Sequence, residues 1–261
     1  MATIAQWDIN NECNLNCKHC RVSEKNDNEK LSLNEVKNLL AQCWYNGITM
    51  LNLSGGEPFL RKDIFDILDY AEKFEDIVIT TNGTLLDENK CKKLSTYNNI
   101  KLSISLDGLE ETHDKFRRRK GAFKKVIDTL PLLNKYNIKY AIKYTLSKET
   151  ARDAVELLNF IAKMGAKEFN VRRVIVAGNA SKDMVLSNEE YKNIIRELIQ
   201  NCRKLDVKFR TGDPLLIPIF SEVWGIDIKN DDLSKIYAGC QAGDEIIYID
   251  YKGNVGACSY I

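Results

Sequence analysis

The chain has 261 residues, of which 44% are hydrophobic and 29% are charged, and its 38 basic and 37 acidic residues give a net charge of +1. This length and composition predict a globular protein with one large domain. The balanced charge gives no reason to expect nucleic acid or an anionic membrane as a partner. No apolar run approaches the roughly 20 residues that span a bilayer. A missing secretory leader predicts a cytoplasmic protein with reduced cysteines.

Short β-rich runs alternate with amphipathic stretches, which predicts parallel strands joined by helical crossovers. The expected strands are residues 4–9, 50–53, 77–81, 101–106, 140–146 and 169–176, and the expected helices are residues 33–45, 64–74, 87–94, 123–136, 151–164 and 188–205. Six such units are too few to close an eight-stranded barrel, so an open doubly wound α/β sheet or a partial barrel fits. In both folds, ligand-binding loops lie beyond the carboxyl ends of the strands.

The sequence changes character after about Lys208. Pro214 and Pro218 interrupt it, and residues 237–258 read as a hairpin that turns at Lys252 and Gly253. We therefore expect a main domain over residues 1–207 and a small appended module over residues 208–261.

Three cysteines, Cys13, Cys17 and Cys20, follow the first expected strand at C-x3-C-x2-C spacing. Such a loop can direct three thiols at one iron–sulfur cluster, although a four-iron cluster normally takes four protein thiolates. A cluster with one open iron could bind and activate a small molecule. The alternative is zinc bound by these cysteines and His19, but His19 and Cys20 are adjacent, and adjacent residues rarely both face one tetrahedral ion.

The motif SGGEP, residues 54–58, follows the second expected strand. Gly55 and Gly56 let the backbone approach a ligand closely, and Glu57 could hold an ammonium group. A tight turn without a ligand explains the same residues.

Two further polar segments end the next strands. The turn TTNG, which contains Asn82, follows the third strand, and SISLDG ends the fourth. Ser105 and Asp107 alternate onto the same side and could bond to sugar hydroxyls. The basic run at residues 117–120 is the only conspicuous charge cluster, and a solvated face is its default interpretation.

Together, CNLNCKHC, SGGEP, the TNG turn, SLDG with HDKFR, and VIVAGNA resemble the radical S-adenosylmethionine (radical SAM) superfamily over about residues 1–180. The resemblance implies a partial (β/α)6 TIM-like barrel with a 4Fe-4S cluster on three cysteines. It also implies that the methionine part of S-adenosylmethionine (SAM) chelates the open iron. Reductive cleavage of SAM then yields a 5′-deoxyadenosyl radical that abstracts a substrate hydrogen.

The resemblance implies roles for individual residues. Cys13, Cys17 and Cys20 would ligate the cluster, His19 would pack near the adenine, Gly55, Gly56 and Glu57 would bind the methionine amino group, and Ser105 and Asp107 would face the ribose or the methionine carboxylate. Asn82 is a further strand-end candidate. Arg173 could meet the carboxylate or form a structural salt bridge, and Arg117 is expected to cap the following helical region. Thr150 stands where similar proteins often carry Asn, which is a departure from the family pattern.

Cys240 and Cys258 frame a C-x12-G-x4-C pattern that resembles the opening of a SPASM or twitch extension. Such extensions carry auxiliary iron–sulfur clusters, and two unpaired hairpin thiols are the alternative. The later cysteines of the extension do not follow before Ile261, so we expect an incomplete ligand set.

The implied function is radical modification of a ribosomally made peptide, by crosslinking, epimerisation or maturation, with electrons from a donor such as flavodoxin or ferredoxin. The first strand begins at about residue 4, so no peptide-recognition domain is expected before the barrel. This expectation counts against a peptide substrate. A small-molecule dehydrogenase or cofactor-biosynthesis enzyme is the alternative within the family. A non-catalytic electron-transfer protein is the alternative from another class, although it would not need an amine-binding SGGEP turn.

Overall fold

The computed structural model describes residues 3–22, 30–213, 216, 219, 222–223 and 240–260. The expected interruptions at Pro214 and Pro218 and the chain end at Ile261 lie outside these residues. The described part contains one nine-stranded sheet in the order β7-β6-β5-β4-β3-β2-β1-β8-β9. Its strands are β1 (Ile4–Asp8), β2 (Met50–Ser54), β3 (Asp76–Thr81), β4 (Ile100–Ser105), β5 (Lys139–Leu146), β6 (Glu168–Arg173), β7 (Lys208–Arg210), β8 (Ile246–Ile249) and β9 (Val255–Gly256).

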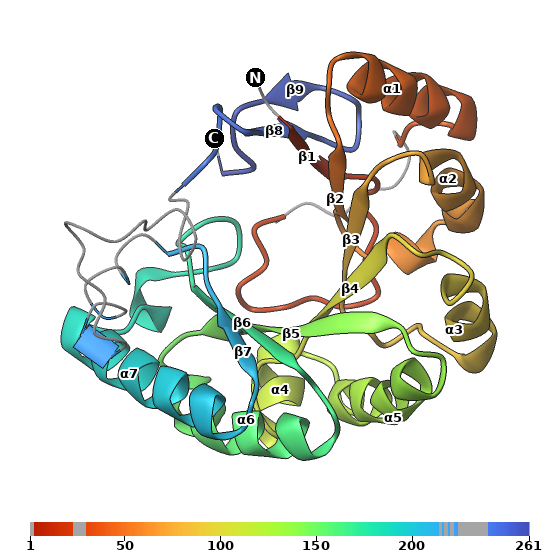
Figure 1. The fold of residues 1–261 in the computed structure, drawn as a ribbon. Coiled ribbons are helices and arrows are strands. Elements are labelled where there is room, and N and C mark those ends of the chain that lie inside the picture. The colour runs from red at the N-terminus through yellow and green to blue at the C-terminus, as the bar shows by residue number, and fades with distance from the viewer. Residues whose placement is uncertain are drawn as a thin grey trace.

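Helices surround the outside of the curved sheet (Figure 1). They are α1 (Leu33–Tyr45), α2 (Ile64–Ala71), α3 (Glu88–Leu94), α4 (Glu110–Arg117), α5 (Ala122–Lys135), α6 (Ala154–Lys163) and α7 (Asn188–Lys204). The six expected helices are confirmed, and α4 is an addition. Within the described residues, none of these helices is both long and apolar enough to cross a membrane.

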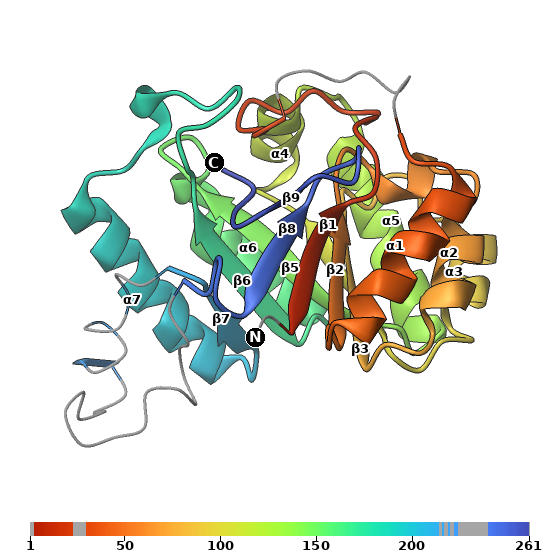
Figure 2. The same ribbon diagram turned by 90° about the horizontal axis from the view of Figure 1, so that it is seen from above.

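The strand order confirms the partial barrel. From β1 to β7 each strand lies beside its predecessor and runs parallel to it, without the reversal of strand order that a doubly wound sheet requires. The helices lie outside the curve, and Figure 2 shows the open end with the loop after β1 and helix α4. The fold is therefore an open barrel whose concave side is free of helices.

The C-terminal hairpin belongs to the same sheet. Strand β8 pairs with β1 in parallel, and β9 pairs with β8 in antiparallel orientation. The turn at Lys252 and Gly253 is confirmed, because the Asp250 carboxylate accepts bonds from the backbone N–H groups of Lys252 and Asn254 at 2.9 and 2.8 Å. The domain boundary between residues 207 and 208 stays a prediction.

The two faces of the sheet differ in chemistry. Along β1, Ala5 and Trp7 are fully buried in the hydrophobic core beneath the helices, while Gln6 and Asp8 alternate onto the opposite, concave face. The same alternation puts polar residues of β2, β4, β5 and β6 on that face. The concave face is therefore suited to a polar ligand, and it opens toward the loop after β1.

Candidate functional site

The cysteine loop, residues 9–22, begins where β1 ends, and the SGGEP turn holds its first part. The N–H of Gly56 donates to the Asn10 carbonyl at 3.0 Å, and the N–H of Glu57 donates to the Glu12 carbonyl at 2.7 Å. A Cβ on Gly55 would lie 2.2 Å from the Asn10 oxygen, and one on Gly56 would lie 1.9 Å from the Glu12 oxygen. The glycines thus permit a close backbone approach, as expected, but in this structure the chain they approach is the protein's own.

The VIVAGNA segment holds the other end of the cysteine loop. The N–H of Asn179 donates to the Cys20 carbonyl at 2.8 Å, and its side-chain amide donates to the Cys17 carbonyl at 3.3 Å. A Cβ on Gly178 would lie 2.4 Å from the Cys20 oxygen. Two segments distant in sequence therefore fix the backbone on which the three thiols sit.

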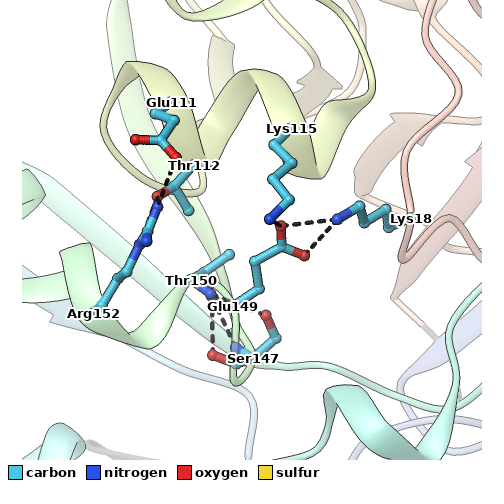
Figure 3. A network of polar contacts seen from close by, with 8 residues as sticks. All are labelled: Lys18, Glu111, Thr112, Lys115, Ser147, Glu149, Thr150 and Arg152. Atoms are coloured by element: carbon cyan, nitrogen blue, oxygen red, sulfur yellow. Dashed lines mark hydrogen bonds and ion pairs between the residues drawn. The ribbon is translucent and has the colours of Figure 1, made fainter.

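A third anchor lies in the middle of the loop. The Lys18 ammonium donates to both carboxylate oxygens of Glu149 at 2.8 Å, and Lys115 of α4 approaches the same carboxylate at 3.6 Å (Figure 3). The neighbouring Thr150 is fully buried, and its hydroxyl donates to the Thr145 carbonyl at 2.8 Å and accepts from the Ser147 N–H at 2.9 Å. The Thr150 hydroxyl therefore serves the turn after β5.

The three cysteines are free thiols, and Cys13 and Cys17 receive N–H donors from the protein. The Leu15 N–H lies 3.4 Å from Cys13 Sγ, and the Arg117 guanidinium lies 3.6 Å from Cys17 Sγ. Such donors favour the thiolate form that ligates metal and tune the potential of an iron–sulfur cluster. Burial raises the pKa of the Cys17 thiol, while the adjacent guanidinium opposes that rise.

The arrangement of these donors does not match a tetrahedral zinc site. Among the described residues, no three His, Cys, Asp or Glu side chains converge closely enough to hold a single metal ion. Tetrahedral zinc needs that convergence, whereas the irons of a four-iron cluster are spread over a cube and accept sulfurs that are farther apart. The ring of His19 instead stacks on Phe116, with centroids 4.4 Å apart and planes 8° apart.

A buried ion pair lies next to Cys17. The Asp107 carboxylate is fully buried, accepts from Arg117 Nε at 2.6 Å and from the Thr145 N–H at 2.7 Å, and also contacts Arg117 Nη2. Burial would raise the pKa of Asp107, but the Arg117 guanidinium, His19, His113 and the Thr145 N–H together hold the pKa below its ordinary value. The expectation that Arg117 caps a helix is wrong, because its guanidinium links the end of β4 to the cysteine loop.

Glu57 is the second buried carboxylate of the site. It is 0% exposed and accepts from Thr81 Oγ1 and the Asn82 N–H, both at 2.7 Å, and from the Phe59 N–H at 3.3 Å. Burial raises its pKa to about 6, against these hydrogen bonds, which lower it. Glu57 thus ties SGGEP to the end of β3, and its contact with a methionine amino group stays a prediction.

Two other predicted residues lie at neighbouring strand ends. The Asn82 amide donates to Asn14 Oδ1 at 2.9 Å and lies 3.9 Å from Cys13 Sγ. Ser105 is buried at the end of β4. The structure therefore brings the third and fourth strand ends to the cysteine loop, as their positions in the sequence suggested.

The two arginines of β6 face opposite ways. Arg173 donates to Asp213 at 3.1 Å and lies over the Tyr191 ring of α7, 4.1 Å from its centroid, so it takes the salt-bridged alternative. Its neighbour Arg172 is exposed and alternates onto the concave face. A cofactor contact by Arg173 stays a prediction.

Sequence reasoning missed Lys143 of β5. It pairs in register with Ser105 and shares the concave face with it. Loss of hydration lowers the pKa of Lys143 to about 7, with Arg172, Arg117 and Arg21 contributing repulsion. The period-two alternation of β5 was a signal that could have identified this cation.

A second missed group joins the C-terminal hairpin to the cysteine loop. The buried Asp8 carboxylate accepts from Ser54 Oγ and from the Tyr248 hydroxyl, both at 2.7 Å, and forms an ion pair with Arg21. Arg21 directly follows Cys20, and its guanidinium lies 5.6 Å from the Tyr248 ring centroid. No local sequence pattern indicates this contact, because it depends on the pairing of β8 with β1.

The two hairpin cysteines lie in sparser surroundings. Cys240 is exposed and Cys258 is half-buried, and both are free thiols. An auxiliary cluster on them stays a prediction. The remaining cysteines, Cys43, Cys91 and Cys202, are buried in helices α1, α3 and α7.

Comparisons with known proteins identify the family of the chain. A family model described as the radical SAM superfamily matches residues 7–161. The AdoMet-dependent heme synthase of Methanosarcina barkeri is 28% identical over 98% of this chain and 76% of its own length. The antilisterial bacteriocin subtilosin biosynthesis protein AlbA of Bacillus subtilis is 30% identical over 98% of this chain and 54% of its own. The crystal structure of Streptococcus suis SuiB bound to precursor peptide SuiA superposes with a TM-score of 0.83 at 19% identity, covering 99% of this chain and 60% of SuiB.

Proposed function

Because the chain belongs to the radical SAM superfamily, we propose that it cleaves SAM reductively and abstracts a hydrogen atom from a ribosomally made peptide. The observation that carries this proposal is the cysteine loop, held between SGGEP and Asn179 at the open end of a polar concave face. When bound on Cys13, Cys17 and Cys20, a 4Fe-4S cluster supplies the electron that cleaves SAM to methionine and a 5′-deoxyadenosyl radical.

The chain's own residues have separable tasks in this proposal. Arg117 stabilises negative charge on Cys17 while it neutralises Asp107. Lys143 and Ser105, opposite each other on β5 and β4, are placed to hold an anionic carboxylate of the ligand. Glu57 fixes the end of β3 beside Cys13 through Thr81 and the backbone of Asn82.

A peptide substrate is supported by the relatives whose names concern peptides. AlbA serves the biosynthesis of a bacteriocin, and SuiB is bound to a precursor peptide. Because the chain spans only 54% and 60% of these two proteins, their activities serve here only as support for the proposal.

A small-molecule substrate is the second candidate. It is favoured by the heme synthase of M. barkeri, which aligns with 98% of this chain. Coexpression with short peptides encoded beside the gene, followed by mass spectrometry, separates the two: a mass change of the peptide that requires Cys17 supports the first candidate. An unchanged peptide, together with turnover of a tetrapyrrole, supports the second.

The central experiment is SAM cleavage by the anaerobically reconstituted protein under dithionite. We expect 5′-deoxyadenosine from the parent and from Cys43→Ala, whose thiol is buried in α1 away from the loop. Cys17→Ala should lose at least 100-fold in rate, because it removes a ligand of the cluster. Equal product from Cys17→Ala and the parent would overturn the proposal.

The auxiliary cluster has a test of its own. Iron is counted after reconstitution of a variant in which Cys13, Cys17 and Cys20 are all alanine. Residual iron that disappears when Cys240 and Cys258 are also replaced supports a second cluster at the hairpin, and no residual iron excludes it from this chain.

A further inference from the structure

The basic run at residues 117–120 is divided by the fold into a buried part and an exposed part. Arg117 is buried against Asp107. Arg118, Arg119 and Lys120 are exposed and form the turn between α4 and α5. The expected solvated face therefore consists only of the last three residues, which lie together in one turn.

The backbone of this turn is tightly specified. Arg118 ends α4 in the left-handed conformation, with φ +53° and ψ +38°, where glycine is the usual residue. The Asp114 carboxylate accepts bonds from the backbone N–H groups of Gly121 and Phe123. The left-handed backbone at Arg118 therefore fixes the direction in which the chain leaves α4.

The exposed cations of the turn lack acidic partners within the described part of the chain. No ion pair there involves Arg118, Arg119, Lys120 or the nearby Lys125. Asp114 is occupied by backbone N–H groups inside the turn, and Glu149 pairs with Lys18 and Lys115 instead (Figure 3). The turn is thus a concentrated positive patch on a chain whose net charge is only +1.

This patch adjoins the cysteine loop. A pocket is lined by Arg119, Lys120 and Lys125 together with Asn14, Leu15 and Thr84. Leu15 donates its N–H to Cys13 Sγ at 3.4 Å. A protein seated on the patch would therefore rest directly against the segment that carries the first cysteine.

We propose that the turn of residues 118–120, with Lys125, is the docking surface for an acidic one-electron carrier protein. The inference rests on the proposed function, because electron delivery has a purpose only if the cysteine loop holds a redox centre. In each encounter a flavin hydroquinone of the carrier would lose one electron and one proton and become the semiquinone. The proton would go to solvent, and the electron would reduce the cluster that Cys13, Cys17 and Cys20 would hold. Opposite charges on the two partners steer the encounter and orient the carrier.

The binding test needs no loaded enzyme. Titration of the full chain with oxidised flavodoxin, an acidic carrier, is followed by calorimetry at 50 mM salt. The triple variant Arg118→Glu, Arg119→Glu, Lys120→Glu should bind about tenfold or more weakly, and binding by the parent should weaken as salt is raised to 300 mM. The matched control, Lys192→Glu, Arg203→Glu, Lys204→Glu, makes the same charge change on exposed residues of α7 and should stay within about twofold of the parent.

Two further variants keep the test decisive if the triple variant folds poorly. Arg119→Glu with Lys120→Glu leaves the left-handed residue intact and should still weaken binding, and Arg118→Lys keeps the charge and should bind like the parent. Equal binding by the parent and both charge-reversed patch variants overturns the proposal. Tighter binding of a labelled 20-nucleotide RNA than of flavodoxin by the parent, at the same salt, overturns it in favour of nucleic acid.

Turnover separates this proposal from the one on which it rests. With dithionite as reductant, the triple variant should cleave SAM at the parent's rate, because in the described part of the chain none of the replaced side chains forms a hydrogen bond or ion pair with the cysteine loop. With flavodoxin hydroquinone its rate should fall about tenfold. Failure of the parent under dithionite refutes the proposed function, whereas an undiminished flavodoxin-driven rate in the triple variant refutes the docking surface alone.

Discussion

The cysteine loop and the C-terminal hairpin both present cysteines at the same sheet, yet they are built differently. The loop is held by backbone bonds from SGGEP and Asn179, and a buried guanidinium lies beside Cys17. The hairpin places Cys240 in solvent and Cys258 at the surface, and its two-residue strand β9 is exposed. The comparison shows that the cysteine loop is held in one geometry by contacts from several parts of the fold. The presence of Cys240 and Cys258 in the sequence does not by itself indicate how rigidly the hairpin holds them.

The largest expected difference between the two regions concerns buried charge. Arg117→Met leaves Asp107 buried without its guanidinium, which should lower the free energy of unfolding by about 3–5 kcal/mol. Lys252→Met, an exposed change in the hairpin turn, should alter it by less than about 0.5 kcal/mol. Urea unfolding followed by circular dichroism measures both. Equal losses would remove the distinction between the regions.

Paired glycines test the packing of the two regions. A Cβ on Gly56 would lie 1.9 Å from the Glu12 oxygen, so Gly56→Ala should cost about 2–3 kcal/mol. A Cβ on Gly256 in β9 would have nothing within 4 Å, so Gly256→Ala should be neutral within about 0.5 kcal/mol. Thermal unfolding of the two variants gives the comparison, and a Gly56→Ala protein as stable as the parent would contradict it.

The pH dependence of stability probes Glu57. Its pKa in the folded protein, about 6, exceeds its ordinary value of 4.5, so the folded state binds the proton more tightly than the unfolded state. Stability should therefore fall by about 2 kcal/mol as pH rises from about 4.5 to 6, and this component should be absent from Glu57→Gln. Urea unfolding at several pH values measures the difference between the two proteins. A constant difference across this range would show that Glu57 keeps an ordinary pKa.

The smallest expected effect concerns the contact between the regions. Tyr248→Phe removes the hydroxyl that bonds to Asp8 at 2.7 Å and should cost about 1 kcal/mol. Tyr251→Phe, three residues along the hairpin, is the matched control and should be close to neutral. Chemical denaturation measures the free energy of unfolding of both variants. Equal values would mean that the contact with Asp8 does not contribute to stability.

The regular elements and the cysteine loop were predictable because they follow from local patterns. The six strands and six helices correspond to hydrophobic periodicity, and C-x3-C-x2-C is a local motif. Helix α4 was missed because its eight residues, EETHDKFR, are strongly polar, and β7 was missed because it has three residues. Both elements depend on tertiary contacts that short sequence windows do not contain.

Side-chain partners were harder to predict than positions. Gly55 and Gly56 were predicted to let the backbone approach a ligand, which stays a prediction. The neighbour seen in the structure, the chain at Asn10 and Glu12, is known only once β1 and β2 pair. Alternation along β6 could have distinguished Arg172 from Arg173. It could not have shown that Arg117 reaches Asp107, since that contact depends on α4.

The bond between Tyr248 and Asp8 joins residues 240 positions apart. During synthesis, strands β1 to β6 can assemble one beside the next as each emerges, while β1 remains an edge strand until β8 has been made. The cysteine loop directly follows β1, yet the Asp8 carboxylate acquires its Tyr248 partner only after β8 has been made, 240 positions later. The loop therefore has all of these supports only once β8 has paired with β1.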